Sequence, residues 1–99
     1  MGEMTALLEE IGALIEAPKV DRAHVERTLT DGYAHALTLE AERTRLQKRV
    51  DEMTRDLRGD AVSVRTTELR SLARELDGTS GELSRLRARL AELRRRASD

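Results

Sequence analysis

The sequence predicts an all-α protein: a long antiparallel helical hairpin (coiled coil) with a short N-terminal helix packed at its base or in a dimer interface. Apolar residues recur every three or four positions through most of the 99 residues, which is the spacing of one helix face. Charged residues make up 37% of the chain, and Tyr33 is the single aromatic residue. This composition suits narrow seams between helices, because compact cores usually bury several large aromatic side chains.

The first predicted helix covers residues 3–16. Its apolar residues are spaced by three and four and so share one stripe, formed by Met4, Leu7, Leu8, Ile11, Leu14 and Ile15. Pro18 is expected to end this helix, because the residue before a proline disfavours the helical conformation. The stripe can fold back onto the rest of the chain or pack against a second copy.

The second predicted helix covers residues 21–58 and begins with Asp21 as its N-cap. Steps of four and three alternate for five heptads along its seam, which contains Val25, Leu29, Gly32, Ala36, Leu39, Arg43, Leu46, Val50, Met53 and Leu57. Gly32 could separate two helices or allow close approach within one. The unbroken phase favours close approach, although Gly costs ~1 kcal/mol relative to Ala in a helix.

The third predicted helix covers residues 62–97. One row of its seam is spaced by seven, at Val62, Leu69, Leu76, Leu83, Leu90 and Ala97, and Arg65, Leu72, Thr79, Leu86 and Leu93 complete the heptads. Residues 78–81 contain two glycines and could kink or break the helix, with Thr79 and Glu82 as a capping box. The heptad phase continues through this stretch, so one long helix is favoured and a short break near Gly78 is the alternative.

A short link between two long helices predicts that they lie antiparallel, as one single helical domain over residues 1–99. If Leu57 faces Val62, the equal rise per residue of the two helices determines which other residues face one another. The expected pairs are Val50 with Leu69, Arg43 with Leu76, Ala36 with Leu83, Gly32 with Leu86, Leu29 with Leu90 and Val25 with Leu93. The hairpin would be roughly 55 Å long at the standard helical rise.

The charge balance and cysteine content limit the possible function classes. The net charge is −1, with eight acids and three bases in residues 1–40 and eleven acids and fifteen bases in residues 41–99. The chain has no cysteine, which excludes disulfides and thiolate chemistry and fits a reducing compartment. No basic region precedes the first apolar run, and no apolar run reaches the length of a membrane span. We therefore expect a cytoplasmic protein with no membrane contact.

The two histidines are candidate metal ligands. His24 and His35 are eleven residues apart, which is ~16 Å along a helix. Asp21 is the acidic neighbour of His24, and Asp31 is that of His35. Such acid–histidine pairs could bind a metal ion across a dimer interface. Zinc sites need three or four convergent ligands, and we expect no metal site and no cofactor.

Nothing in the sequence indicates catalysis. There is no cysteine nucleophile, glycine-rich phosphate loop or Ser–His–Asp cluster, and a narrow helical hairpin offers no concave pocket. We expect the protein not to be an enzyme. Near the predicted hairpin turn, Asp51, Asp56 and Asp60 are expected to be solvated, and Arg58-Gly59-Asp60 is expected to supply turn residues.

The last predicted helix is basic, and phosphate contacts are possible at Arg85, Arg89, Arg94, Arg95 and Arg96. Three structural explanations compete. Cations are favoured at a helix C-terminus, arginines beside a leucine seam can pair with glutamates of a facing helix, and the acidic first helix, with Glu9, Glu10 and Glu16, can neutralise them. No aromatic residue is available near them for base stacking. Nucleic-acid or transcription-associated binding is therefore the alternative function.

The favoured function is a non-enzymatic interaction protein that associates with itself, as a homodimer or higher homo-oligomer, and with another protein. It would act as an adaptor or assembly component. An exposed apolar stripe marks an interaction surface. The expected contact residues are Leu7, Leu8, Ile11, Leu14, Ile15, Val25, Leu29 and Tyr33.

Overall fold

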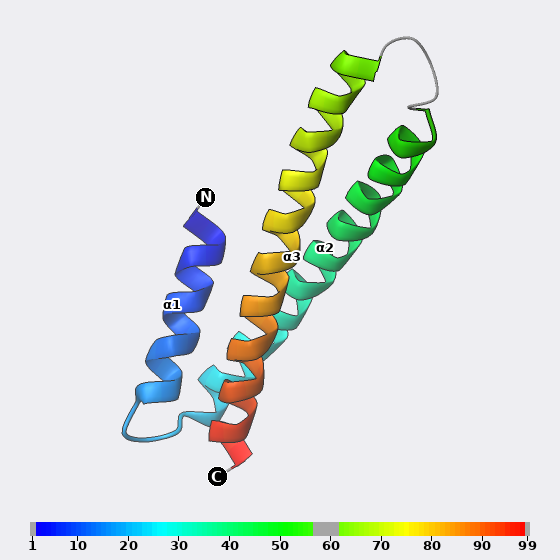
Figure 1. The fold of residues 1–99 in the computed structure, drawn as a ribbon. Helices are drawn as coiled ribbons and strands as arrows, with labels where there is room; N and C mark the ends of the chain where they lie inside the picture. The colour runs from blue at the N-terminus through cyan, green and yellow to red at the C-terminus, as the bar shows by residue number, and fades with distance from the viewer. Residues whose placement is uncertain (1, 57–61, 99) are drawn as a thin grey trace. The chain divides into compact units, whose positions relative to one another are not determined.

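The computed structural model describes residues 2–56 and 62–98, with the side chains of residues 62–64 excepted. This part of the chain is all-α, as predicted, and consists of α1 (Gly2–Glu16), α2 (Arg22–Asp56) and α3 (Val62–Ser98), without a strand (Figure 1). The chain divides into two compact units. Unit 1 comprises Met1–Leu37 with Leu83–Asp99, and unit 2 comprises Thr38–Glu82.

The helix ends follow the local signals. α1 ends at Glu16, two residues before Pro18. At the start of α2, the backbone N–H of His24 donates to the Asp21 carboxylate at 3.2 Å, and the N–H of Val25 donates to the Asp21 carbonyl at 2.9 Å. These bonds satisfy backbone donors that a helix start otherwise leaves unpaired, so the prediction of Asp21 as N-cap is confirmed.

Unit 1 contains α1, the first part of α2 and the last part of α3. The single chain buries Ile11 of α1 completely, so α1 packs against its own chain in this unit. Its core residues lie on all three helices: Ile11, Leu14, Val25, Thr28, Ala36, Leu83, Leu86, Leu90 and Leu93. Thr28 lies outside the predicted seam.

Unit 2 contains the second part of α2 and the first part of α3. Its buried side chains are Leu39, Leu46, Leu72 and Thr79, whereas Val50, Met53, Leu69 and Leu76 are half-buried. Two helices therefore bury their shared seam only in part. Gly78 and Gly81 lie inside α3, which continues through them without interruption.

Gly32 lies within continuous α2, at a point of close approach to α3 in unit 1. A Cβ atom added at Gly32 would overlap Cδ2 of Leu90 and lie 3.3 Å from its Cγ. Leu90 supplies the atoms nearest to this Cβ, whereas the sequence predicts Leu86 near Gly32. Side chains on a helix lean toward its N-terminus, so Leu90 reaches the level at which Gly32 passes.

The predicted hairpin turn, including Leu57 and Arg58-Gly59-Asp60, lies outside the described residues, as does the side-chain pairing of Leu57 with Val62.

Candidate functional site

The predicted contact residues differ in their exposure. Three of them, Ile11, Leu14 and Val25, are between 0% and 9% exposed and form the core of unit 1. Four more are half-buried: Leu7, Leu8, Ile15 and Leu29. Tyr33 alone of this set is exposed, at 41%. The buried residues stabilise unit 1 itself, so Tyr33 is the predicted residue best placed to meet another molecule.

Tyr33 has an apolar neighbour that the predicted contact set did not include. Leu37 lies one helical turn further along α2 and is 65% exposed, and these two are the exposed large hydrophobic residues of the described chain. Residues four apart on a helix share one side. The spacing from Tyr33 is thus the sequence signal for Leu37.

Tyr33 of this apolar pair contacts α3 in unit 1. Nη1 of Arg94 donates to the Tyr33 hydroxyl at 3.5 Å, which links the two helices. A shallow hollow of about 560 Å³ lies on α3 and is lined by Ala91, Arg94, Arg95 and Ser98. We name the surface formed by the exposed residues Glu26, Thr30, Tyr33, Leu37, Ala91, Arg94 and Ser98 the Tyr33 face.

α1 covers a different side of the same helices. The Glu10 carboxylate lies 2.8 Å from Nε2 of His24 and accepts a bond from the buried Thr28 hydroxyl at 3.3 Å. Tyr33 follows Thr28 by five positions, which is about 140° around a helix. In unit 1, α1 and the Tyr33 face therefore lie on opposite sides of α2.

On α3, too, α1 and the Tyr33 face lie on opposite sides of the helix. A Cβ atom at Gly12 of α1 would lie 3.5 Å from Nη2 of Arg89, and Arg94 follows Arg89 by five positions. Arg96 Nη2 also donates to the carbonyl of Ala17, just after α1. One side of the α2–α3 pair in unit 1 is thus covered by α1, and the Tyr33 face is left uncovered.

Glu10 is the residue whose ionisation this packing changes. The hydrogen bond with His24 lowers the pKa of Glu10 most, and the Thr28 hydroxyl and the charges of His24 and Arg27 lower it further, whereas partial burial opposes them. The net direction is downward, so the contacts of α1 with α2 favour the ionised carboxylate.

The five arginines predicted as possible phosphate contacts do not form one stripe. On a helix of 3.6 residues per turn, Arg85, Arg89 and Arg96 share the side toward α1, and Arg94 lies on the Tyr33 face. Three of the five have partners within the chain: Arg89 with Glu92 at 3.1 Å, Arg94 with Tyr33, and Arg96 with the Ala17 carbonyl. This division leaves fewer arginines available for a single phosphate backbone.

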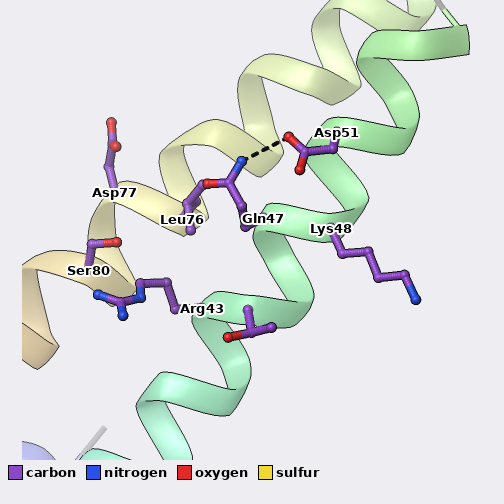
Figure 2. Close-up of a pocket in the computed structure, with 8 residues that line it drawn as sticks. Arg43, Gln47, Lys48, Asp51, Leu76, Asp77 and Ser80 are labelled. Carbon is purple, nitrogen blue, oxygen red and sulfur yellow. Dashed lines mark hydrogen bonds between the residues drawn. The ribbon is translucent and has the colours of Figure 1, made fainter.

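Unit 2 has a shallow hollow of its own, of about 540 Å³, between its two helices (Figure 2). Nε2 of Gln47 donates to the Asp51 carboxylate at 3.0 Å. Figure 2 shows the Arg43 side chain extending toward Ser80 of α3 and the Lys48 ammonium directed away from α3. The exposed polar side chains around this hollow have the arrangement of a solvated helix surface.

Within residues 2–56 and 62–98, no group of three or more His, Cys, Asp or Glu residues is arranged to hold a metal ion. None of the helices in this described part is both long enough and apolar enough to cross a membrane.

No protein-family model, curated protein or solved structure matches this chain.

Proposed function

We propose that this chain is a non-enzymatic interaction protein that associates with itself through the Tyr33 face and serves as an adaptor or assembly component in the cytoplasm. The exposure of Tyr33 and Leu37 is the observation that carries this proposal. Tyrosine and arginine are enriched among the residues that contribute most to binding at protein interfaces. Here Tyr33 and Arg94 are already in contact.

The contrast with the other large apolar residues of unit 1 supports this choice of surface. Four leucines of α3 in this unit are at most 1% exposed: Leu83, Leu86, Leu90 and Leu93. Leu37 on α2 is 65% exposed. Covering it would stabilise a complex by ~25 cal/mol for each Å² of apolar area removed from water. Two large side chains make a small patch, so we expect self-association in the micromolar range or weaker.

A second part of the proposal concerns unit 2. α2 and α3 each contribute residues to both units. We propose that they form one continuous antiparallel hairpin whose unit 2 segment is available to a different protein. Its half-buried seam and exposed charged residues resemble a helix pair that receives a further helix.

Sedimentation equilibrium of the wild-type protein, from ~1 µM to ~1 mM, tests self-association over the corresponding range of affinities. The average mass should rise from the 11.1 kDa of one chain toward twice that value. Leu37→Lys should keep the mass near that of one chain. Ala13→Lys adds the same charge at an exposed position of α1 and should associate as the wild type does. A wild-type mass of one chain at every concentration would contradict the proposal.

A further inference from the structure

The Tyr33 face also indicates how two copies would be oriented, an inference that rests on the proposed self-association. We infer that its partner is a second copy of this chain, related by a two-fold axis parallel to the helices. In this arrangement α2 of one copy lies antiparallel against α3 of the other. Glu26 of each copy then faces Arg94 of the other copy.

The two halves of the face are complementary in size. The α2 half has two large apolar side chains, Tyr33 and Leu37, whereas the α3 half has the small residues Ala91 and Ser98 beside a hollow of about 560 Å³. A two-fold axis places the large half of each copy on the small half of the other, as isologous interfaces require. The arginine side chain beside the hollow can also stack on the partner's tyrosine ring.

The two halves are complementary in charge as well. Glu26 precedes Tyr33 by seven residues, which is two helical turns, so it lies on the same side of α2. Its carboxylate is exposed and makes no bond among the contacts described for this part of the chain. The α3 half presents Arg94 and, beside it, Arg95. Packing α2 on the partner's α3 therefore brings an acid to a base twice, once in each symmetry-related half of the interface.

The other two-fold arrangement is unfavourable. An axis perpendicular to the helices would pack α2 on the partner's α2 and α3 on the partner's α3. An axis at the level of Arg94 would bring Arg94 and Glu26 each onto the same residue of the other copy, and like charges in an interface are repulsive. An axis at the level of Tyr33 and Leu37 would instead bring these large side chains onto each other and leave the hollow beside Ala91 empty.

An exchange of charges between copies tests this orientation. Glu26→Arg places Arg opposite Arg94 twice in its own homodimer, and Arg94→Glu places Glu opposite Glu26 twice. Each variant alone should associate at least about tenfold more weakly than the wild type, because close like charges replace close opposite charges. An equimolar mixture should form heterodimers of near wild-type affinity, because both contacts are then Arg with Glu.

The mixture separates contacts between copies from contacts within one copy. Repulsion within a single chain cannot be relieved by adding a second variant, so recovery on mixing reports on the interface. Glu9→Arg and Arg70→Glu give the same net charges at exposed positions off the face, and each should still associate alone. Far-UV circular dichroism should show that all four variants remain helical.

The outcomes distinguish this inference from the proposal beneath it. The wild type could form a dimer while the Glu26→Arg and Arg94→Glu variants stay apart when mixed, or while each associates normally alone. Either result overturns the orientation and leaves self-association intact. A wild-type protein that never associates overturns the proposed function and this inference together. If Glu9→Arg and Arg70→Glu also associated more weakly alone and recovered on mixing, the effect would be overall charge attraction. That result would overturn the specific pairing of Glu26 with Arg94.

Discussion

The same heptad pattern of α3 is buried to different extents in the two units. In unit 1, Leu86 and Leu93 are 0% exposed, whereas in unit 2 the best-buried leucine of α3, Leu72, is 7% exposed and Leu76 is half-buried. The two units differ by α1, which belongs to unit 1 alone. A heptad seam thus specifies which residues face a partner helix, and a third helix decides how completely they are removed from water.

A third helix covers only one side of a helix pair. In unit 1 that side includes Thr28 and Arg89, and the other side is the Tyr33 face. Unit 1 therefore combines the most complete core of the described residues with the exposed pair Tyr33 and Leu37. The stable core holds the surface that we propose for self-association.

The largest expected contrast between the units comes from truncating one leucine in each. Leu86→Ala should lower the free energy of unfolding by about 3–5 kcal/mol, because it leaves a cavity in a fully enclosed site. Leu76→Ala is the matched change in unit 2 and should cost about 1–2 kcal/mol, because a half-buried site loses less apolar area and can relax. Urea denaturation measures both values. Equal losses would contradict the difference in burial.

Two glycines of different units should respond oppositely to alanine. Gly81→Ala in unit 2 has open space around the new methyl group and should stabilise the protein by up to ~1 kcal/mol through helix propensity. Gly32→Ala in unit 1 gains the same propensity but must displace the buried Leu90, and overpacking typically costs ~1–3 kcal/mol. Thermal unfolding should therefore show a higher Tm for Gly81→Ala and a lower Tm for Gly32→Ala. A Tm raised by both would contradict the close approach of α2 and α3.

The smallest expected effect concerns the polar contact that holds α1 on α2. Because the pKa of Glu10 is lowered in the folded chain, its contribution to stability is complete above the ordinary glutamate pKa of ~4.3. That contribution is lost as the pH falls through the lower folded value. Between pH 5 and pH 3, Glu10→Gln should lose less stability than the wild type in urea titrations. Glu9→Gln, at an exposed neighbouring position, should lose as much stability as the wild type does over this pH range. If Glu10→Gln also lost as much stability as the wild type, the contact would be contradicted.

Heptad periodicity was sufficient to predict an all-α fold, because apolar spacing determines which residues a helix can bury. It placed Leu83, Leu86, Leu90 and Leu93 on one seam, and all four are buried. It did not identify Leu90 as the side chain over Gly32, because residue levels alone ignore the lean of side chains toward the helix N-terminus.

The site was harder to predict than the fold. Apolar spacing assigned Ile11 and Tyr33 equally to an interface, because it cannot distinguish packing within a chain from packing between chains. The structure buries Ile11 under its own chain and leaves Tyr33 and Leu37 exposed. The sequence does not predict the burial of Thr28, because this burial depends on α1 and on the bond to Glu10, eighteen positions earlier.

A dilution series followed by two-dimensional amide NMR of the wild-type protein tests the central claim most directly. Between ~1 mM and ~20 µM, a range that covers weak dimers, signals of residues on the Tyr33 face, such as Tyr33, Leu37 and Ala91, should shift with concentration. Signals from residues 40–55 and 66–80 in unit 2 should stay in place. Shifts confined to unit 2, or no shifts at any residue, would contradict self-association through the Tyr33 face.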